Sequence, residues 1–177
     1  MNICVYGAAS DNIHAEYLAA GEELGRLMAE KGHRLIFGGG ASGLMGAVAR
    51  GVYAGGGEMV SVVPSFFNVD GVLFAYSNEL VYTETMRERK RIMEERSDAF
   101  IVTPGGIGTY DEFFEMFTLL TLGRHQKPIV ILNTRGYFDA MREMLDKTVR
   151  EGFMTETKRN MVSFFDTPDA LLDSLTV

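Results

Sequence analysis

A glycine-rich stretch near the middle of the chain carries the residue types best suited to binding a charged ligand. Gly105, Gly106 and Gly108 follow Pro104, directly after a short apolar and β-branched run, and a helical pattern begins at Thr109. Because glycine has no Cβ, the backbone can turn tightly there, while the first N–H groups of the next helix and the positive end of its dipole attract anions. We therefore predict that this strand-to-helix corner binds a phosphate.

Glu112 follows this corner at a spacing that allows two interpretations. A carboxylate beside a phosphate is repelled unless it has another task, and the obvious task is chemistry on the rest of a phosphorylated ligand. Alternatively, Thr109 and Glu112 have the spacing of a capping box, in which the carboxylate of Glu112 would accept a hydrogen bond from the Thr109 amide. The spacing alone leaves both interpretations open.

A basic helix expected at residues 85–96 supplies cations for such a ligand. A charge run on a helix is usually a solvated face, and the glutamates of the same helix offer ordinary surface pairs. Arg89 and Lys90 stand out because their helix directly precedes the strand that leads to the glycine corner, which can place it across the same crevice. An arginine there could hold a phosphate with two parallel hydrogen bonds.

Two further corners of small residues follow predicted strands. Gly38, Gly40 and Gly43 fit G-x-G-x-x-G, but they follow the second strand instead of the first, and the next strand ends without the acidic residue of a dinucleotide site. Leu44 stands where a Walker loop needs a lysine. This block predicts a phosphate or nucleotide corner, whereas the corner at residues 7–10 is explained by ligand contact or by close packing of strand and helix.

The elements that must position these residues alternate between strand and helix. Strands are expected at residues 2–6, 34–37, 58–63, 79–82, 99–103, 128–132 and 161–165, and helices at residues 11–31, 47–54, 85–96, 109–122, 137–151 and from 167 onward. Such alternation predicts an α/β fold, a single-domain, Rossmann-like, doubly wound, mostly parallel sheet with helices on both faces. The whole chain, residues 1–177, is expected to form one nucleotide-binding α/β domain.

The composition argues against several kinds of partner, location and cofactor. The net charge of −7 argues against a general nucleic-acid or anionic-membrane surface. No apolar run approaches a membrane span, and the single cysteine, Cys4, cannot pair within the chain, so a cytoplasmic location is expected. The histidines are scattered, with no cysteine or carboxylate at metal spacing, so neither a metal nor an organic cofactor is expected.

Two segments contain more apolar residues than a single buried face would require. Residues 65–78 have no clear period, and a subunit interface, a flap over the site or plain packing could each account for them. The helix expected at residues 109–122 is apolar around much of its circumference, which predicts a homodimer formed by this helix and the helix around Arg89. Its apolar residues are Phe113, Phe114, Met116, Phe117, Leu119, Leu120 and Leu122.

Three blocks of this sequence together resemble one known family. Residues 104–112 resemble the P-G-G-x-G-T-x-x-E signature of the LOG ("Lonely Guy") family, residues 38–46 its other glycine block, and residues 86–93 its M-x-x-R-K-x-x-M helix. The resemblance extends from Ile3 to about Phe153. Members of this family are cytokinin riboside 5'-monophosphate phosphoribohydrolases, often mislabelled as lysine decarboxylases.

This resemblance implies hydrolysis of the N-glycosidic bond of a purine nucleoside 5'-monophosphate, AMP or an N6-modified AMP, to free base and ribose 5-phosphate. It implies that Arg89 and Glu112 are catalytic. The implied substrate- and phosphate-binding positions are Lys90, Gly105, Gly106, Ile107, Gly108, Thr109, Gly39, Gly40, Ser42, Gly43 and Thr118. The base pocket, between Pro64 and Tyr82, is not assigned, because the sequence departs there from the plant-like members.

The alternative is a non-catalytic nucleotide or molybdenum-cofactor carrier of the same fold, and the pairing of Arg89 with Glu112 favours the enzyme. A single-stranded DNA binder is disfavoured by the acidic net charge and by the lack of a basic aromatic strip. A lysine decarboxylase is disfavoured because nothing supplies a pyridoxal-phosphate lysine with its surrounding pocket.

Overall fold

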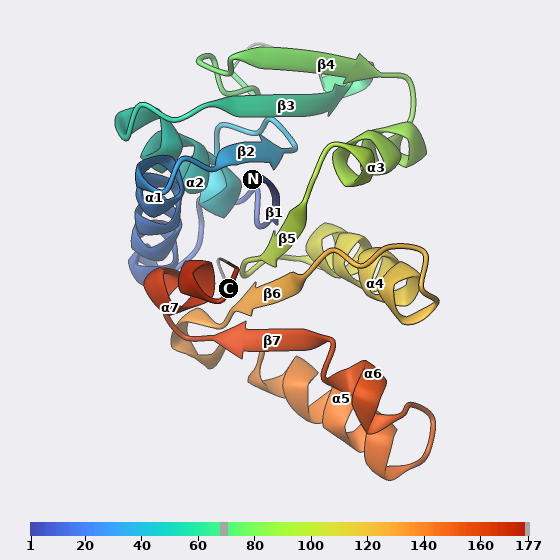
Figure 1. Cartoon of the computed structure of the whole chain (residues 1–177). Coiled ribbons are helices and arrows are strands. Elements are labelled where there is room, and N and C mark those ends of the chain that lie inside the picture. The colour runs from blue at the N-terminus through green and yellow to red at the C-terminus, as the bar shows by residue number, and fades with distance from the viewer. Residues whose placement is uncertain (68–70, 176–177) are drawn as a thin grey trace.

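The structure of the protein is a computed structural model that describes residues 1–67 and 71–175. Within these residues a seven-stranded sheet has the order β4-β3-β2-β1-β5-β6-β7, and each neighbouring pair of strands is parallel (Figure 1). The strands are β1 (Asn2–Tyr6), β2 (Arg34–Phe37), β3 (Met59–Pro64), β4 (Glu79–Thr83), β5 (Ala99–Val102), β6 (Ile129–Leu132) and β7 (Val162–Phe165).

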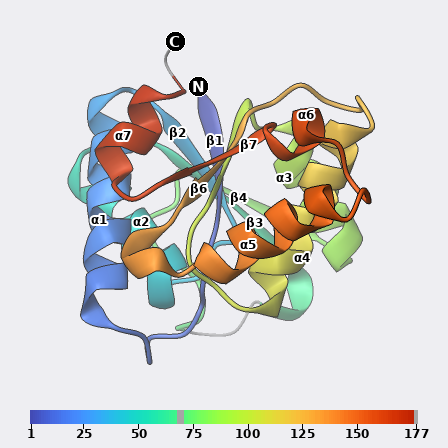
Figure 2. The same cartoon turned by 90° about the horizontal axis from the view of Figure 1, so that it is seen from below.

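Helices cover both faces of this sheet, as the alternating pattern predicts. Figures 1 and 2 show α1, α2 and α7 on one face and α3, α4, α5 and α6 on the other. The helices are α1 (Ala15–Glu30), α2 (Gly43–Ala54), α3 (Met86–Glu95), α4 (Ile107–Thr121), α5 (Asp139–Arg150), α6 (Glu156–Arg159) and α7 (Pro168–Asp173), with short 3₁₀ turns at η1 (Ser65–Phe67) and η2 (Thr134–Gly136). Across the described ranges, no helix combines the length and apolar character needed to cross a bilayer.

Two apolar cores lie between the sheet and its helices. On one face, Leu24 of α1 and Val48 of α2 pack with Phe37 of β2. On the other face, Met93 of α3 and Phe113 of α4 belong to the second core cluster. Because the central strands are buried on both sides, they read as continuous apolar runs, which is the pattern of a parallel sheet. The predicted doubly wound α/β fold is confirmed.

The structure differs from the predicted elements mainly at helix ends and in one additional short helix. The first helix begins at Ala15, where the His14 side chain accepts from the Glu16 amide. The helix expected from residue 137 begins at Asp139, because a 3₁₀ turn with Arg135 at φ 57° precedes it. The short helix α6 was not predicted. The helix expected from Thr109 begins at Ile107, two residues earlier, with Gly106 as its N-cap.

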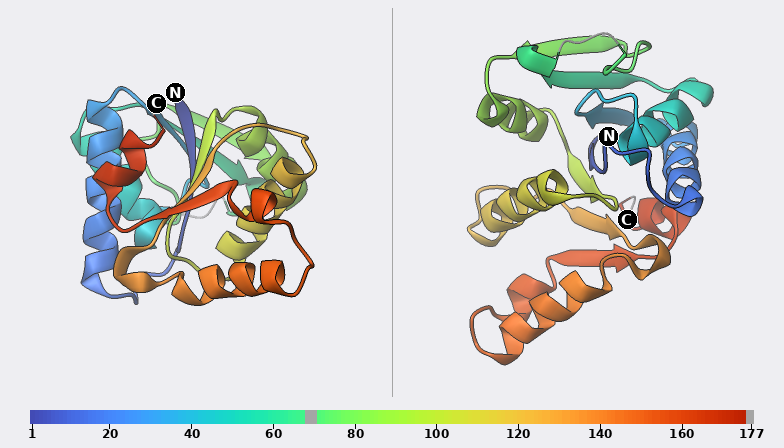
Figure 3. Two further views of the ribbon diagram at one scale, coloured as in Figure 1. Left: turned by 60° about the horizontal axis from the view of Figure 1, so that its bottom comes forward. Right: turned by 180° about the vertical axis from the view of Figure 1, so that it is seen from behind.

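The strand order leaves one topological switch point, between β1 and β5. The chain leaves β1 toward α1 on one face and leaves β5 toward α4 on the opposite face, and the blue α1 and yellow α4 in Figure 3 lie on opposite sides of the sheet. Connections that diverge in this way leave a crevice at the carboxyl ends of the two strands. The residues that follow Tyr6 and Val102 therefore lie beside each other, and an Ala8 N–H to Pro104 carbonyl hydrogen bond of 3.1 Å joins them.

Candidate active site

A cavity of about 390 Å³ lies at this switch point. Its floor is the end of β1 with the following residues Gly7, Ala8 and Ala9, so the corner at residues 7–10 contributes to the cavity as well as to packing. Arg89 from α3 and Glu112 from α4 line it, together with the beginning of α4. The cavity thus brings together three of the sequence blocks that suggest chemistry.

Arg89 is held firmly although it comes from a highly charged helix. Its Nε donates to the carbonyl oxygen of Val62 at 3.1 Å, and its Nη1 donates to Oε1 of Glu112 at 2.8 Å. The residue is only 8% exposed. Its remaining nitrogen, Nη2, lies against Gly38, where the absence of a side chain leaves room for the guanidinium. The Arg89 side chain therefore links β3, the second glycine block and α4 around the cavity.

Glu112 is the acidic partner of this arginine and not a helix cap. Its carboxylate bonds Arg89. Of the two interpretations that the spacing left open, the capping box with Thr109 is wrong, because α4 begins at Ile107 and Thr109 already lies in its first turn. Burial raises the pKa of Glu112 above its ordinary value of 4.5, and the positive charge of Arg89 opposes that rise. A buried carboxylate at a cavity wall suits proton transfer or stabilisation of a developing cation.

The glycine corner presents free backbone donors. Gly106, Gly108 and Thr109 line the cavity, and within the described residues no hydrogen bond engages the N–H groups of residues 106–109. Gly105 lies just behind them, with its carbonyl oxygen accepting from the Tyr137 hydroxyl at 2.6 Å. The side chain of Ile107 points to solvent and is 83% exposed. Unpaired amides at a helix N-terminus are the arrangement that binds phosphate groups.

Lys90 lies outside the cavity lining. Its Nζ is 2.9 Å from Oδ2 of Asp111 and 2.6 Å from Oε2 of Glu115, so it bridges two carboxylates of α4. Burial lowers the pKa of Lys90, but these two carboxylates outweigh burial and raise it overall. In this structure Lys90 therefore pairs α3 with α4 instead of facing the cavity, although Asp111 itself lines the cavity.

The second glycine block contributes less than its length suggests. Gly38, Gly40 and Met45 of this block line the cavity, whereas the predicted positions Gly39, Ser42 and Gly43 are not part of its lining. Gly39 and Gly43 have φ of 78° and 64°, a left-handed backbone that favours glycine, and the Gly43 amide donates to Oδ1 of Asp11 at 2.7 Å. Ser42 is the N-cap of α2 but makes no side-chain cap hydrogen bond.

Thr118 lies away from the other predicted positions. It lines a separate groove of about 590 Å³ with Phe114 and Phe117 of α4 and with residues that follow α5, among them Phe153. The structure therefore does not bring Thr118 to the cavity that holds Arg89 and Glu112 in this chain.

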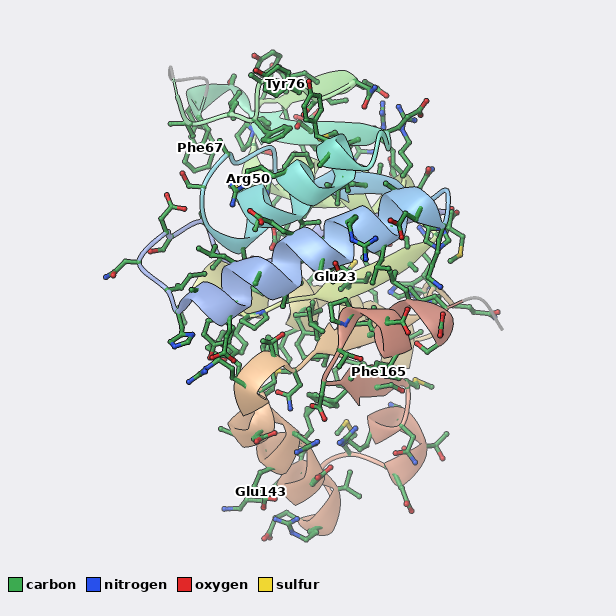
Figure 4. All side chains as sticks on the ribbon, turned by 90° about the vertical axis from the view of Figure 1, so that its left-hand side faces the viewer. Glu23, Arg50, Phe67, Tyr76, Glu143 and Phe165 are labelled. Atoms are coloured by element: carbon green, nitrogen blue, oxygen red, sulfur yellow. The ribbon has the colours of Figure 1, made fainter. Side chains whose placement is uncertain are left out.

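Sequence reasoning named a flap over the site as one of three alternatives for residues 65–78, but it assigned no residue to an apolar wall of the cavity. This wall consists of Met45, Phe67, Val72, Leu73, Met86 and Met93. Three of these residues come from the apolar stretch at residues 65–78, so part of that stretch borders the site; residues 68–70 lie outside the described residues. Figure 4 shows Phe67 and Tyr76 near the β3–β4 end of the molecule, far from Glu143. The sequence did hold a signal for this wall, because the stretch at residues 65–78 is apolar without the period of a helix or a strand.

These residues define what the cavity can do chemically. The cavity lining offers unpaired amides for an anion, a buried carboxylate bonded to a guanidinium, and an apolar wall. In the described ranges no group of three or more histidine, cysteine or acidic side chains is arranged to hold a metal ion. The arrangement suits a phosphorylated ligand that also has an apolar or aromatic part.

Comparisons with solved structures agree with this fold. The molybdenum cofactor binding protein of Rippkaea orientalis matches with a TM-score of 0.71 and 20% identity, covering 99% of this chain and 96% of the other. The molybdenum cofactor carrier protein of Chlamydomonas reinhardtii matches with a TM-score of 0.72 and 20% identity, covering 98% and 94%. At such low identity these likenesses show a shared fold.

Comparison with known sequences identifies the family of this chain. A family model described as "Possible lysine decarboxylase" matches residues 45–175. The cytokinin riboside 5'-monophosphate phosphoribohydrolase of Mycobacterium tuberculosis is 44% identical over 155 residues, which cover 88% of this chain and 82% of that protein. The probable phosphoribohydrolase LOGL5 of Oryza sativa subsp. japonica is 38% identical over 173 residues, covering 98% and 70%. The chain therefore belongs to the LOG family, whose members carry the name of cytokinin riboside 5'-monophosphate phosphoribohydrolase.

Proposed function

We propose that this protein hydrolyses the N-glycosidic bond of a purine nucleoside 5'-monophosphate to the free base and ribose 5-phosphate. The observation that carries the proposal is the hydrogen bond of 2.8 Å between Arg89 and Glu112, in the wall of a cavity that also presents free amides. Membership of the LOG family and the names of the relatives support the same reaction.

The free amides at the start of α4 would hold the 5'-phosphate. Gly106, Gly108 and Thr109 line the cavity at the helix N-terminus, where backbone donors and the helix dipole favour an anion. Ile107 would contribute its amide only, because its side chain faces solvent. Fixing the phosphate at this end fixes the ribose near Glu112, which starts the second turn of the same helix.

Glu112 would act on the ribose and on the attacking water. When the bond from ribose C1' to the base nitrogen breaks, positive charge develops on the sugar, and a nearby carboxylate stabilises it. The water oxygen bonds to C1' as the bond from C1' to the base nitrogen breaks, and Glu112 accepts one of the water protons. That proton then passes from Glu112, directly or through solvent, to the departing base nitrogen, which regenerates the carboxylate. Arg89 would keep the carboxylate of Glu112 ionised and in place, and its Nη2 nitrogen is free within the described residues to contact the substrate.

The apolar wall suits a purine and favours an N6-modified AMP over AMP. Six apolar side chains form this wall, and a hydrocarbon substituent on the base would bury surface there that AMP does not offer. Of the remaining predicted positions, only Gly40 would contact the substrate directly. The others would support the loops around the cavity or complete the site in an assembly; they are Lys90, Gly39, Ser42, Gly43, Gly105 and Thr118.

We also infer that the protein is a homodimer and works in the cytoplasm. The dimer is supported by apolar side chains of α4 and its C-cap that remain exposed, since Phe114 in the helix is 36% exposed and Leu122 at the C-cap is 63% exposed. The location is supported by Cys4, a buried and unpaired thiol of the kind that persists in reducing compartments.

Chromatography of the reaction products tests the proposed hydrolysis. AMP and N6-isopentenyladenosine 5'-monophosphate are each incubated with wild type, Glu112→Gln and the control Glu95→Gln, whose carboxylate pairs with Arg91 on the surface of α3. We expect wild type and the control to release base and ribose 5-phosphate, and Glu112→Gln to be at least about a hundredfold slower while staying folded. If both nucleotides bind but neither is cleaved, the protein is a nucleotide carrier.

A further inference from the structure

The carbonyl oxygen of Gly105 is held by a side chain from another part of the sheet. The Tyr137 hydroxyl donates to it at 2.6 Å, across 32 residues of sequence. Tyr137 does not line the cavity, so it approaches the glycine corner from outside. This contact belongs neither to the core nor to the catalytic pair, and it anchors the peptide group that immediately precedes α4.

The direction of that carbonyl decides the direction of the next amide. In a planar trans peptide the C=O of one residue and the N–H of the following residue point in opposite directions. With the Gly105 oxygen held toward Tyr137, the N–H of Gly106 points away from Tyr137 and toward the cavity that Gly106 lines. This N–H makes no hydrogen bond within residues 1–67 and 71–175, so it is available to a ligand.

A peptide between two glycines needs such an anchor. Glycine occupies a wide range of φ and ψ, so the chain itself restrains the Gly105–Gly106 peptide weakly. The preceding carbonyl, that of Pro104, is already held by the Ala8 amide at 3.1 Å. Tyr137 supplies the restraint on the next peptide.

The turn that carries Tyr137 is itself well braced. Because β6 is the neighbour of β5, the turn after β6 lies beside the glycine corner. Asn133 organises this turn, since its Oδ1 accepts from the Phe138 amide at 2.7 Å and its carbonyl accepts from the Gly136 amide at 2.9 Å. The Tyr137 ring packs edge-on against Tyr17, with centroids 5.9 Å apart.

We propose that Tyr137 is a positioning residue for phosphate binding, whose hydroxyl keeps the Gly106 N–H directed at the 5'-phosphate. The inference rests on the proposed function, because it assigns the phosphate to the glycine corner. Removing the hydroxyl lets the peptide rotate, so fewer molecules present the amide. One ordinary hydrogen bond corresponds to roughly a three- to tenfold change in affinity.

Calorimetric titration with ribose 5-phosphate tests this role without requiring turnover. Tyr137→Phe keeps the ring and should bind ribose 5-phosphate about three- to tenfold more weakly than wild type. Its KM for the nucleotide should rise by a similar factor with kcat within about twofold. The control Tyr17→Phe removes a hydroxyl from the same aromatic cluster and should leave both values unchanged.

A ligand without phosphate separates positioning from general packing. N6-isopentenyladenosine should bind wild type and Tyr137→Phe equally, whereas a packing defect would weaken nucleoside and ribose 5-phosphate alike. Equal binding of ribose 5-phosphate by wild type and Tyr137→Phe, or none by wild type, would overturn the inference. If wild type binds ribose 5-phosphate more tightly than Tyr137→Phe yet releases no base, the hydrolase proposal fails and the role of Tyr137 stands.

Discussion

The guanidinium of Arg89 occupies the space that a side chain at residue 38 would need. A methyl group on Gly38 would lie 1.9 Å from Nη2 of Arg89, far inside the contact distance. Since Nη2 is at the end of a flexible side chain, the arginine would give way and the backbone would stay. The glycine at the end of β2 therefore determines where the proposed catalytic arginine sits.

Gly38→Ala should consequently impair catalysis more than stability. We expect kcat/KM for nucleotide hydrolysis to fall at least about tenfold, because the displaced guanidinium no longer aligns with Glu112. Gly32→Ala is the control: Gly32 has φ 71° with open space around it, so alanine there should cost about 1 kcal/mol of stability and no activity. Thermal unfolding and initial rates, measured together, check both. Wild-type rates in Gly38→Ala would show that the arginine's position is not critical.

The buried position of Glu112 predicts the pH dependence of the reaction. Burial raises its pKa above 4.5, with Arg89 opposing the rise, so the carboxylate takes up a proton at a higher pH than an exposed glutamate would. Because the proposed chemistry needs the ionised form, kcat/KM should fall as pH falls through this raised pKa. The folded state also binds this proton more tightly than the unfolded state, so this group favours folding increasingly as pH falls from the raised value toward 4.5.

Carbon-13 NMR of the glutamate carboxyls measures that pKa directly. The signal that disappears in Glu112→Gln identifies the residue, and its titration midpoint should lie above 4.5 and coincide with the acid limb of kcat/KM. In Arg89→Met the midpoint should move higher still, since the opposing positive charge is gone. A midpoint at or below 4.5 would mean that the pair is more solvated than the structure shows.

The fold was predictable because its signals are local. Buried parallel strands such as β5 are continuous apolar runs, and threonine side chains cap α3 and α7 through Thr85 and Thr167. The site was predictable only where its residues also act locally, as at the glycine corner. The start of α4 was missed because its N-cap, Gly106, has no side chain to signal a cap, while Thr109, three residues later, has the side chain of a typical cap.

The remaining site features depend on partners far away in sequence. The spacing around Glu112 fitted a capping residue as well as a catalytic one, and only the family resemblance paired it with Arg89. In the structure the segment between β4 and β5 brings Arg89, 23 residues earlier, into a hydrogen bond with Glu112. Lys90 is adjacent to Arg89 in sequence but on a helix points elsewhere, where Asp111 and Glu115 engage it. The apolar wall combines methionines of α2 and α3 with residues of the connection between β3 and β4. No periodicity in one segment reveals such a surface.

The exposed apolar side chains of α4 predict how the proposed dimer can be broken. Leu122→Asp places a charge where Leu122 is 63% exposed in the single chain, and a charge buried in an interface is strongly unfavourable. We expect wild type to sediment as a dimer and Leu122→Asp as a monomer at micromolar concentration. Leu80→Asp, on the edge strand β4 and 44% exposed, is the matched control and should remain dimeric. A monomeric wild type would refute the dimer.

The apolar wall of the cavity leads to a prediction about which base the substrate carries, which is tested separately from the hydrolysis itself. Leu73→Asn keeps a side chain of similar size but replaces hydrocarbon with an amide in the wall of the cavity. An isopentenyl group that contacts this wall binds more tightly because hydrocarbon is buried against hydrocarbon. Its binding weakens when the amide of the introduced asparagine must be desolvated to make the same contact. We expect kcat/KM for N6-isopentenyladenosine 5'-monophosphate to fall about three- to tenfold relative to AMP, which a loss of one or two buried methylene contacts would produce.

AMP serves as the internal control, because a misfolded or misaligned site would slow both nucleotides equally. Equal losses would place the base substituent away from Leu73 and leave the preference for a modified base without structural support.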